Sequence, residues 1–269
     1  MKNYFVIGDP IEHSLSPLIF NYLFDYFKIN ATYEKKLIKS DTELKNFMSS
    51  SCVDGFNITS PYKETIFNLL SKHDHSALEY SSVNCIKKDK SNFIGFNTDG
   101  YGFLKMIKKQ KINLHNKNIL ILGYGGSVKT ISNLISSTFN SNLFIYGRND
   151  DKINFFIDAI RSPNQTIYHY QKINDNIDII INCLPGQIDR NSINSTLNYL
   201  NYIPINDENI FIDLNYNETL LNKEIINLKQ IAGFVLGIDM LIFQALKTFE
   251  IWFGINPNNC YEGIRKIIK

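Results

Sequence analysis

Polar side chains gather in three stretches near the start of the chain, each at the end of an expected strand. The stretches are residues 8–17 (GDPIEHSLSP), residues 55–63 (GFNITSPYK), and residues 83–84 (VN) together with 95–100 (GFNTDG). Strand ends in open α/β sheets are where ligands bind. Hydroxyl, amide and charged groups fixed at such ends could hold a small polar molecule through donors and acceptors placed around it.

Lys63 in the second stretch and Asp99 in the third could form a pair that transfers a proton. A lysine held by a carboxylate can donate a proton to an oxygen on which negative charge develops, and its own charge stabilises that oxygen. The simpler alternatives are a solvated Lys63 in a first helical turn and an Asp99 that caps a helix beginning at Gly100.

A glycine-rich turn, GYGGS at Gly123–Ser127, follows the apolar run 118–122 and precedes a helical stretch. Gly123 permits the tight turn, and Gly125 and Gly126 let backbone N–H groups approach a pyrophosphate because no Cβ is in the way. The partial positive charge of the helix N-terminus adds to the attraction. The strand before and the helix after favour a dinucleotide site over a plain turn.

The end of the next expected strand, 143–146, indicates which dinucleotide would bind. An NAD site usually has an acid there, which accepts a hydrogen bond from the ribose 2′-hydroxyl. In this chain Arg148 is the first charged residue after the strand, and Lys152 follows it. A guanidinium suits a 2′-phosphate through bidentate hydrogen bonds and charge, so the sequence favours NADP. A solvated surface arginine is the alternative.

The elements that position these residues alternate between strands and helices, which predicts an α/β fold in two parts. The first part has expected helices from Ser16, as N-cap before Pro17, and at 42–48. Its expected strands are 4–7, 31–37, 55–59, 82–86 and 92–96, the last two paired across a polar turn at 87–91.

The second part is predicted to be a doubly wound, Rossmann-like dinucleotide-binding domain, because its near-continuous apolar strands are typical of a parallel sheet covered on both faces. A helix at 100–111 would lead into it, and a helix after Gly237 would return to the first part. We therefore expect a substrate-binding domain at 1–99, completed by 238–269, and a dinucleotide-binding domain at 100–237. The second part's expected strands are 118–122, 143–146, 178–182, 210–213 and 233–235, with a helix from the glycine turn to about 137.

Composition excludes several classes of protein. A net charge of +2 over 269 residues argues against a general nucleic-acid binder. We expect no signal peptide and no membrane helix, since the best apolar stretch, 234–246, is short and contains Asp239. The four cysteines have neither metal-site nor disulfide spacing. These features predict a soluble, cytoplasmic protein with no metal and no nucleic-acid or membrane partner. The polar strand ends favour a small-molecule substrate, and the sequence leaves both a monomer and a homodimer open.

Together the motifs resemble those of the shikimate dehydrogenase family. The matches follow the family's order from Gly8 to Gly254 and cover nearly the whole chain. They are GDPIEHSLSP at 8–17, NITSPYK at 57–63, VN at 83–84, NTDGYG at 97–102, the glycine turn, and GIDMLIFQA at 237–245 followed by Phe249 and Trp252. The resemblance implies reversible, NADPH-dependent reduction of 3-dehydroshikimate to shikimate in aromatic amino-acid biosynthesis, with a cleft between the two domains.

The resemblance also implies roles for individual residues. Lys63 would give and take the proton, assisted by Asp99. Ser14 and Ser16 would bind the substrate carboxylate. The other implied substrate contacts are Thr59, Asn84, Asp99, Tyr216 and Gln244. The implied cofactor residues are Gly123, Tyr124, Gly125, Gly126, Ser127, Arg148, Asn149, Lys152, Leu214 and Gly237.

Two other functions stay open at this point. One is a quinate or quinate/shikimate dehydrogenase that uses NAD, and the other is a catalytically silent metabolite-binding protein of the same fold. Individual residues also have structural alternatives: the two serines could cap the next helix, and Asn57 and Asn84 could be turn residues. The chain departs from the family pattern on the cofactor side at Tyr124, Gly147 and Leu184, which replace a small residue, an asparagine and a threonine.

Overall fold

Apolar runs of strand length build two sheets, one in each of two units of the chain. In the computed structural model, the described residues are 1–90, 92–160, 167–172, 176–186, 188–203, 205–228 and 231–268. The first unit comprises Met1–Met106 and Met240–Lys269, and the second comprises Ile107–Asp239. Within the described residues, every helix is too short or too polar to cross a membrane.

The first unit contains a five-stranded sheet of order β2-β1-β3-β4-β5. Strands β1, β2 and β3 run parallel, whereas β4 pairs antiparallel with both β3 and β5. The strand bounds are β1 Lys2–Gly8, β2 Ala31–Leu37, β3 Gly55–Ile58, β4 Cys85–Asp89 and β5 Asn92–Phe96.

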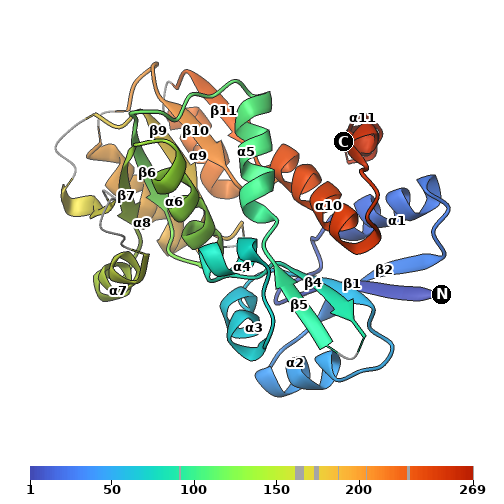
Figure 1. Cartoon of the computed structure of the whole chain (residues 1–269). Coiled ribbons are helices and arrows are strands. Elements are labelled where there is room, and N and C mark those ends of the chain that lie inside the picture. The colour runs from blue at the N-terminus through green and yellow to red at the C-terminus, as the bar shows by residue number, and fades with distance from the viewer. Residues whose placement is uncertain are drawn as a thin grey trace. The chain divides into compact units, whose positions relative to one another are not determined.

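Side chains alternate across β1 and bring helices to both faces of this sheet. Phe5 meets Phe47 of α2 at a ring-centroid distance of 5.4 Å, and Tyr4 stacks on Trp252 of α10 at 4.4 Å on the opposite face. Figure 1 shows α2 on one side of the strands and α1 and α10 on the other. The helices are α1 Ser16–Tyr26, α2 Asp41–Met48, α3 Lys63–Leu69, α4 His75–Tyr80, α5 Asp99–Lys109, α10 Ile238–Phe253 and α11 Tyr261–Ile267.

The second unit contains a six-stranded sheet of order β11-β10-β9-β6-β7-β8, and all its strand pairs are parallel. This is the predicted doubly wound arrangement. The strands are β6 Asn118–Leu122, β7 Asn142–Tyr146, β8 Ile167–His169, β9 Ile179–Asn182, β10 Ile210–Asp213 and β11 Gly233–Leu236.

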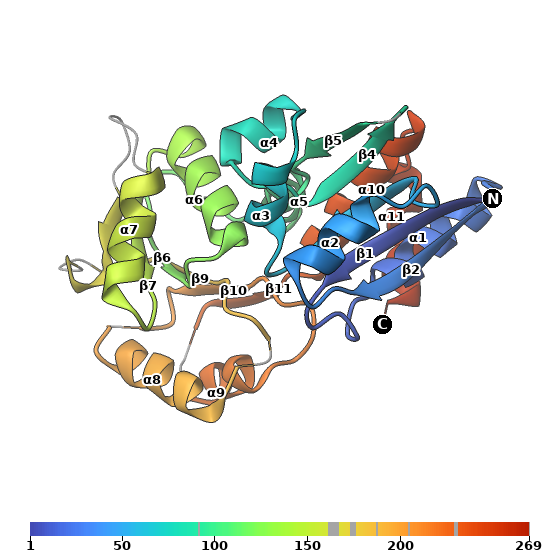
Figure 2. The same ribbon diagram turned by 90° about the horizontal axis from the view of Figure 1, so that it is seen from below.

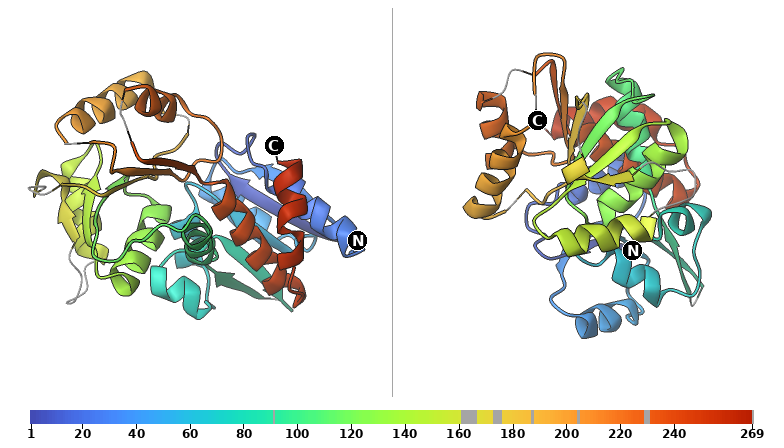
Figure 3. Two further views of the ribbon diagram at one scale, coloured as in Figure 1. Left: turned by 90° about the horizontal axis from the view of Figure 1, so that it is seen from above. Right: turned by 90° about the vertical axis from the view of Figure 1, so that its left-hand side faces the viewer.

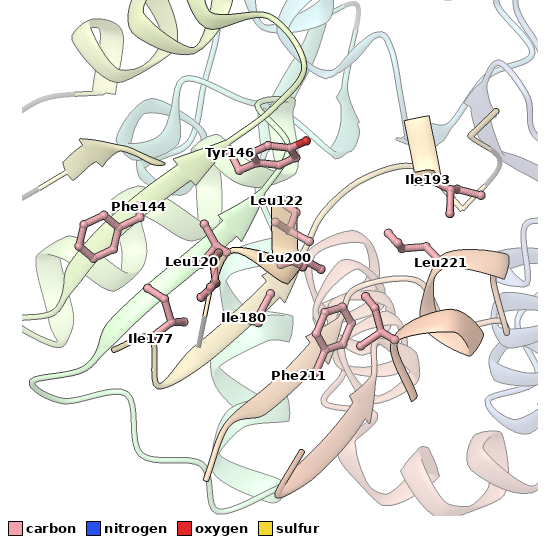
Figure 4. Close-up of a cluster of buried hydrophobic side chains, with 12 residues drawn as sticks. Leu120, Leu122, Phe144, Tyr146, Ile177, Ile180, Ile193, Leu200, Phe211 and Leu221 are labelled. Carbon is pink, nitrogen blue, oxygen red and sulfur yellow. The ribbon is translucent and has the colours of Figure 1, made fainter. Parts of the chain in front are cut away.

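Helices cover both faces of this parallel sheet, as its buried apolar strands require. Helices α6 and α7 lie on one face and α8 and α9 on the other (Figures 2 and 3). Between the sheet and α8 and α9, a core cluster brings Leu120, Ile180 and Phe211 together with Ile193 and Leu200 (Figure 4). The helices are α6 Gly126–Thr138, α7 Asp150–Ile160, α8 Arg190–Asn201 and α9 Leu220–Leu228.

Two local predictions are wrong. Ser16 is not the N-cap of α1, because it already belongs to the helix and Leu15 occupies the cap position without a side-chain hydrogen bond. The polar turn predicted at 87–91 is largely strand: pairing between β4 and β5 continues to Asp89 opposite Asn92, and Ser91 lies outside the described residues. Exposed polar side chains are compatible with this ladder because the backbone alone makes its hydrogen bonds.

Candidate functional site

Lys63 and Asp99 form a largely buried ion pair in the first unit. Lys63 begins α3 shortly after β3, and Asp99 begins α5 shortly after β5. The Lys63 Nζ lies 2.6 Å from the Asp99 Oδ2, and only 13% and 8% of the two side chains are exposed. Lys63 is therefore not a solvated lysine, and its attraction to Asp99 acts where water screens it poorly.

Asn97, rather than the Asp99 carboxylate, accepts the hydrogen bonds from the backbone N–H groups at the start of α5. The Asn97 Oδ1 accepts hydrogen bonds from the backbone N–H groups of Asp99 at 3.0 Å and Gly100 at 3.5 Å. The Asp99 Oδ1 instead accepts from the Asn84 side-chain amide at 2.7 Å. The carboxylate is thus held from two sides, by Lys63 and by Asn84.

Asn84 and Gln244 place further amide groups beside this pair. Both side chains are buried. The Asn84 Nδ2 lies 3.4 Å from the Gln244 Oε1 and 3.0 Å from the Thr98 Oγ1, while the Asn84 Oδ1 accepts from the Thr98 N–H at 2.7 Å. Four of the predicted site residues, Lys63, Asn84, Asp99 and Gln244, are therefore brought together in one hydrogen-bonded group.

A second row of polar residues supports this group and was not predicted. Asn57 lies inside β3 rather than in a turn, and its Nδ2 donates to the Asn84 carbonyl at 3.0 Å and to the Thr248 Oγ1 at 3.2 Å. The Tyr33 hydroxyl donates to the Asn57 Oδ1 at 2.8 Å. The signal in the sequence was the spacing of Gln244 and Thr248, which stand on one face of α10.

Ser16 is connected to the same group through Tyr33. Burial raises the pKa of Tyr33 well above its usual range, and the Ser16 side chain beside it acts in the opposite direction. Ser14 lies half-buried before α1, and its Oγ accepts from the Ser16 N–H at 3.3 Å. Thr59 follows β3 and packs so closely on Gly8 that a Cβ there would lie 2.4 Å from the Thr59 methyl carbon.

In the second unit, the glycine turn joins β6 to α6 with the geometry that a phosphate-binding loop needs. Gly123 has a φ of +115°, which favours glycine. Gly125 is the N-cap of α6, and no side chain caps this helix. A Cβ at Gly125 would meet nothing within 4 Å, so the helix N-terminus opens onto space. This arrangement suits the pyrophosphate of a dinucleotide.

Tyr124 reaches from the glycine turn to the loop after β7. Its ring occupies the space of a side chain at position 147, where a Cβ would lie 2.5 Å from the Tyr124 Cδ1. The two departures from the family pattern at 124 and 147 are therefore a single packing change. The contact also places Arg148, the next residue, beside the glycine turn.

Arg148 lies at the carboxyl end of β7 with a side chain that is 58% exposed. Its Nη1 lies 3.4 Å from the Asp189 Oδ2 and donates to the Ser192 hydroxyl, on the first turn of α8. The Asn149 Oδ1 accepts from the Lys152 N–H at 2.9 Å, and both of these side chains are exposed. Asp189 and Ser192 lie far along the chain from Arg148 and were not among the predicted site residues.

The loop after β10 presents Leu214 and the half-buried Tyr216 and is anchored by a buried carboxylate. The Asp213 Oδ1 accepts from the Asn215 N–H at 2.9 Å and from its side-chain amide at 2.7 Å. Burial raises the pKa of Asp213. Gly237 packs against this loop, since a Cβ there would lie 2.1 Å from the Leu214 carbonyl oxygen.

Comparison with known proteins gives consistent matches. The family described as shikimate dehydrogenase substrate binding domain matches residues 6–86. A protein of Pelagibacter ubique named shikimate dehydrogenase (NADP(+)) is 35% identical over 264 residues, covering 95% of this chain and 95% of that protein. The crystal structure of shikimate dehydrogenase from Aquifex aeolicus is similar at a TM-score of 0.83 and 28% identity, covering 98% of this chain and 97% of that one.

A further crystal structure, of a shikimate dehydrogenase in complex with NADP+, has a TM-score of 0.77 and 26% identity, covering 100% of this chain and 96% of that one. The matches to whole proteins thus extend over both units, well beyond the matched domain. On this evidence the chain belongs to the shikimate dehydrogenase family.

Proposed function

We propose that this protein catalyses the reversible, NADPH-dependent reduction of 3-dehydroshikimate to shikimate in aromatic amino-acid biosynthesis. The observation that carries the proposal is the largely buried Lys63–Asp99 ion pair, with the Asn84 amide bound to Asp99 and the Gln244 amide beside Asn84. The names of the family's members support the substrate and the cofactor. As a biosynthetic enzyme, the protein is expected to act on small molecules in the cytoplasm.

Lys63 is the proposed proton donor. A bound NADPH would supply the hydride to the ketone carbon, and negative charge then develops on the ketone oxygen. The Lys63 ammonium stabilises that charge and transfers one proton to the oxygen, which completes the alcohol. In the oxidation of shikimate, the neutral amine takes the proton back as the carbonyl forms.

Asp99 and the amides have positioning and binding roles in this proposal. Asp99 is already fixed by Asn84, so it holds the Lys63 ammonium in one place, and preorganisation of this kind lowers the cost of reaching the transition state. Asn84, Asp99 and Gln244, with Thr59 and Tyr216, would contact the ring hydroxyls. Ser14 and Ser16 would bind the carboxylate, because hydroxyl groups donate hydrogen bonds to an anion.

The proposed cofactor residues all belong to the second unit. The glycine turn from Gly123 to Ser127, including Tyr124, Gly125 and Gly126, would hold the pyrophosphate at the N-terminus of α6. Arg148, with Asn149 and Lys152 nearby, would bind the 2′-phosphate. Leu214 and Gly237 would lie against the nicotinamide.

The decisive experiment mixes the purified protein with shikimate and NADP and follows the absorbance of NADPH. The proposal requires NADPH to form, and no signal at high enzyme concentration would end it. Replacing shikimate by quinate and NADP by NAD in the same assay tests the alternative of an NAD-dependent quinate/shikimate dehydrogenase. A silent metabolite-binding protein would bind the ligands without turnover.

A further inference from the structure

The guanidinium proposed to bind the 2′-phosphate already has an anionic neighbour. Asp189 is the N-cap residue of α8, where its Oδ1 accepts from the Ser192 N–H at 2.9 Å. Its Oδ2 accepts from the Ser192 hydroxyl and lies 3.4 Å from the Arg148 Nη1. Arg148 in turn donates to the same Ser192 hydroxyl. Arg148, Asp189 and Ser192 thus form a closed polar triangle.

Asp189 carries its negative charge at neutral pH. The hydrogen bonds from Ser192 lower the pKa of its carboxyl group, and the charge of Arg148 lowers it further. The Arg148 and Asp189 side chains are 58% and 61% exposed. Water and salt weaken an ion pair that is this exposed. A more highly charged anion can therefore displace Asp189 from Arg148, but breaking the ion pair subtracts from the binding free energy of that anion.

We propose that Asp189 determines how strongly the protein discriminates NADP from NAD, by competing with the 2′-phosphate for Arg148. This inference rests on the proposed function in one respect, that Arg148 binds the 2′-phosphate. A doubly charged phosphate is repelled by the carboxylate and must draw Arg148 away from it. NAD has a hydroxyl at this position, so its binding does not depend on that exchange.

The test is the substitution Asp189→Asn, which removes the charge but keeps the cap, since asparagine and aspartate cap helices about equally well. Dissociation constants for NADPH and NADH are measured by fluorescence titration at low and high salt, without need of turnover. The constant for NADPH should fall about two- to fivefold at low salt, with NADH unchanged, and the difference should shrink at high salt.

Asp207→Asn is the matched control, because it also removes an exposed carboxylate from the second unit. It should leave the ratio of the two constants unchanged. In an Arg148→Ala background, Asp189→Asn should lose most of its effect, because no guanidinium remains for which the two anions compete.

The outcomes separate this inference from the proposed function. If Arg148→Ala weakens NADPH selectively while Asp189→Asn leaves the ratio unchanged or weakens NADPH, competition by Asp189 is refuted and the cofactor role of Arg148 stands. If Arg148→Ala leaves the ratio unchanged, the 2′-phosphate role of Arg148 and the inference both fail. Neither result affects the proton transfer assigned to Lys63, which is measured by turnover.

Discussion

Removing the amine of Lys63 should damage stability and catalysis through different mechanisms, and a second substitution can separate them. Lys63→Met keeps the apolar part of the side chain but removes the ammonium group beside the buried Asp99 carboxylate. Of the side-chain contacts described above, this carboxylate then keeps the hydrogen bond from Asn84. Breaking a buried pair on one side typically costs about 3–5 kcal/mol. We expect about 3 kcal/mol, because part of the Lys63 side chain reaches solvent and the Asn84 amide stays in place.

The double variant Lys63→Met/Asp99→Asn leaves no unpaired charge in this position. Replacing both members of a buried pair is often close to neutral, so we expect the free energy of unfolding to return to within about 1 kcal/mol of the wild type. Activity should not return. Both variants should lose about 10²- to 10⁴-fold in kcat, the usual contribution of a general acid. In Lys63→Met, which keeps every proposed ring contact, KM for shikimate should change much less.

Urea unfolding followed by tryptophan fluorescence gives the stabilities, and NADP reduction with shikimate gives kcat and KM. The single variant Asp99→Asn is the matched comparison, because it removes the carboxylate charge beside the Lys63 ammonium and keeps the ammonium. Near-normal kcat in Lys63→Met would remove Lys63 from the mechanism. A double variant as unstable as Lys63→Met would show that lost packing, rather than the uncompensated carboxylate, causes the destabilisation.

Three further predictions concern other parts of the molecule. Arg148→Ala should raise KM for NADP and leave KM for NAD nearly unchanged in the shikimate assay, and equal effects on both would contradict the 2′-phosphate role. Gly237→Ala should lower the free energy of unfolding by about 1–3 kcal/mol, because its Cβ would overlap the Leu214 carbonyl, and urea titration measures this. Thr248→Val should cost about 1–3 kcal/mol by leaving one of the two N–H groups of the buried Asn57 amide without its acceptor, while the other keeps the Asn84 carbonyl, and an unchanged unfolding midpoint would show that the freed N–H finds another acceptor.

Most strands of the second sheet could be predicted from the sequence because they are short apolar runs, whereas β8, with the sequence IYH, was not predicted. Runs such as 118–122 and 210–213 match β6 and β10 within the second sheet. Helix α8 was not predicted. It contains four asparagines, and one of its buried positions, between Ile193 and Leu200, is occupied by the polar Thr196. The spacing of apolar residues that indicates an amphipathic helix is therefore interrupted.

The site was predictable where chemistry singled out a residue type. Lys63 and Asp99 are 36 residues apart in the sequence, yet a lysine and an acid at strand ends are unusual enough to suggest a pair. Thr248 and Tyr33 look like ordinary core residues, and only the fold shows which amide they support. Asp189 was missed because helix capping alone explains an aspartate at that position, and because its contact with Arg148 spans 41 residues of the chain.

The contact between Tyr124 and position 147 constrains the order in which mutations can be accepted. A Cβ at position 147 would overlap the tyrosine ring, so Gly147→Asn, which restores the family's residue, should be harmful in the present chain. The same substitution should become tolerable once Tyr124→Ala has cleared the space. The two positions therefore show epistasis, and a lineage or a protein engineer moving toward the family's pattern has to change the turn before the loop.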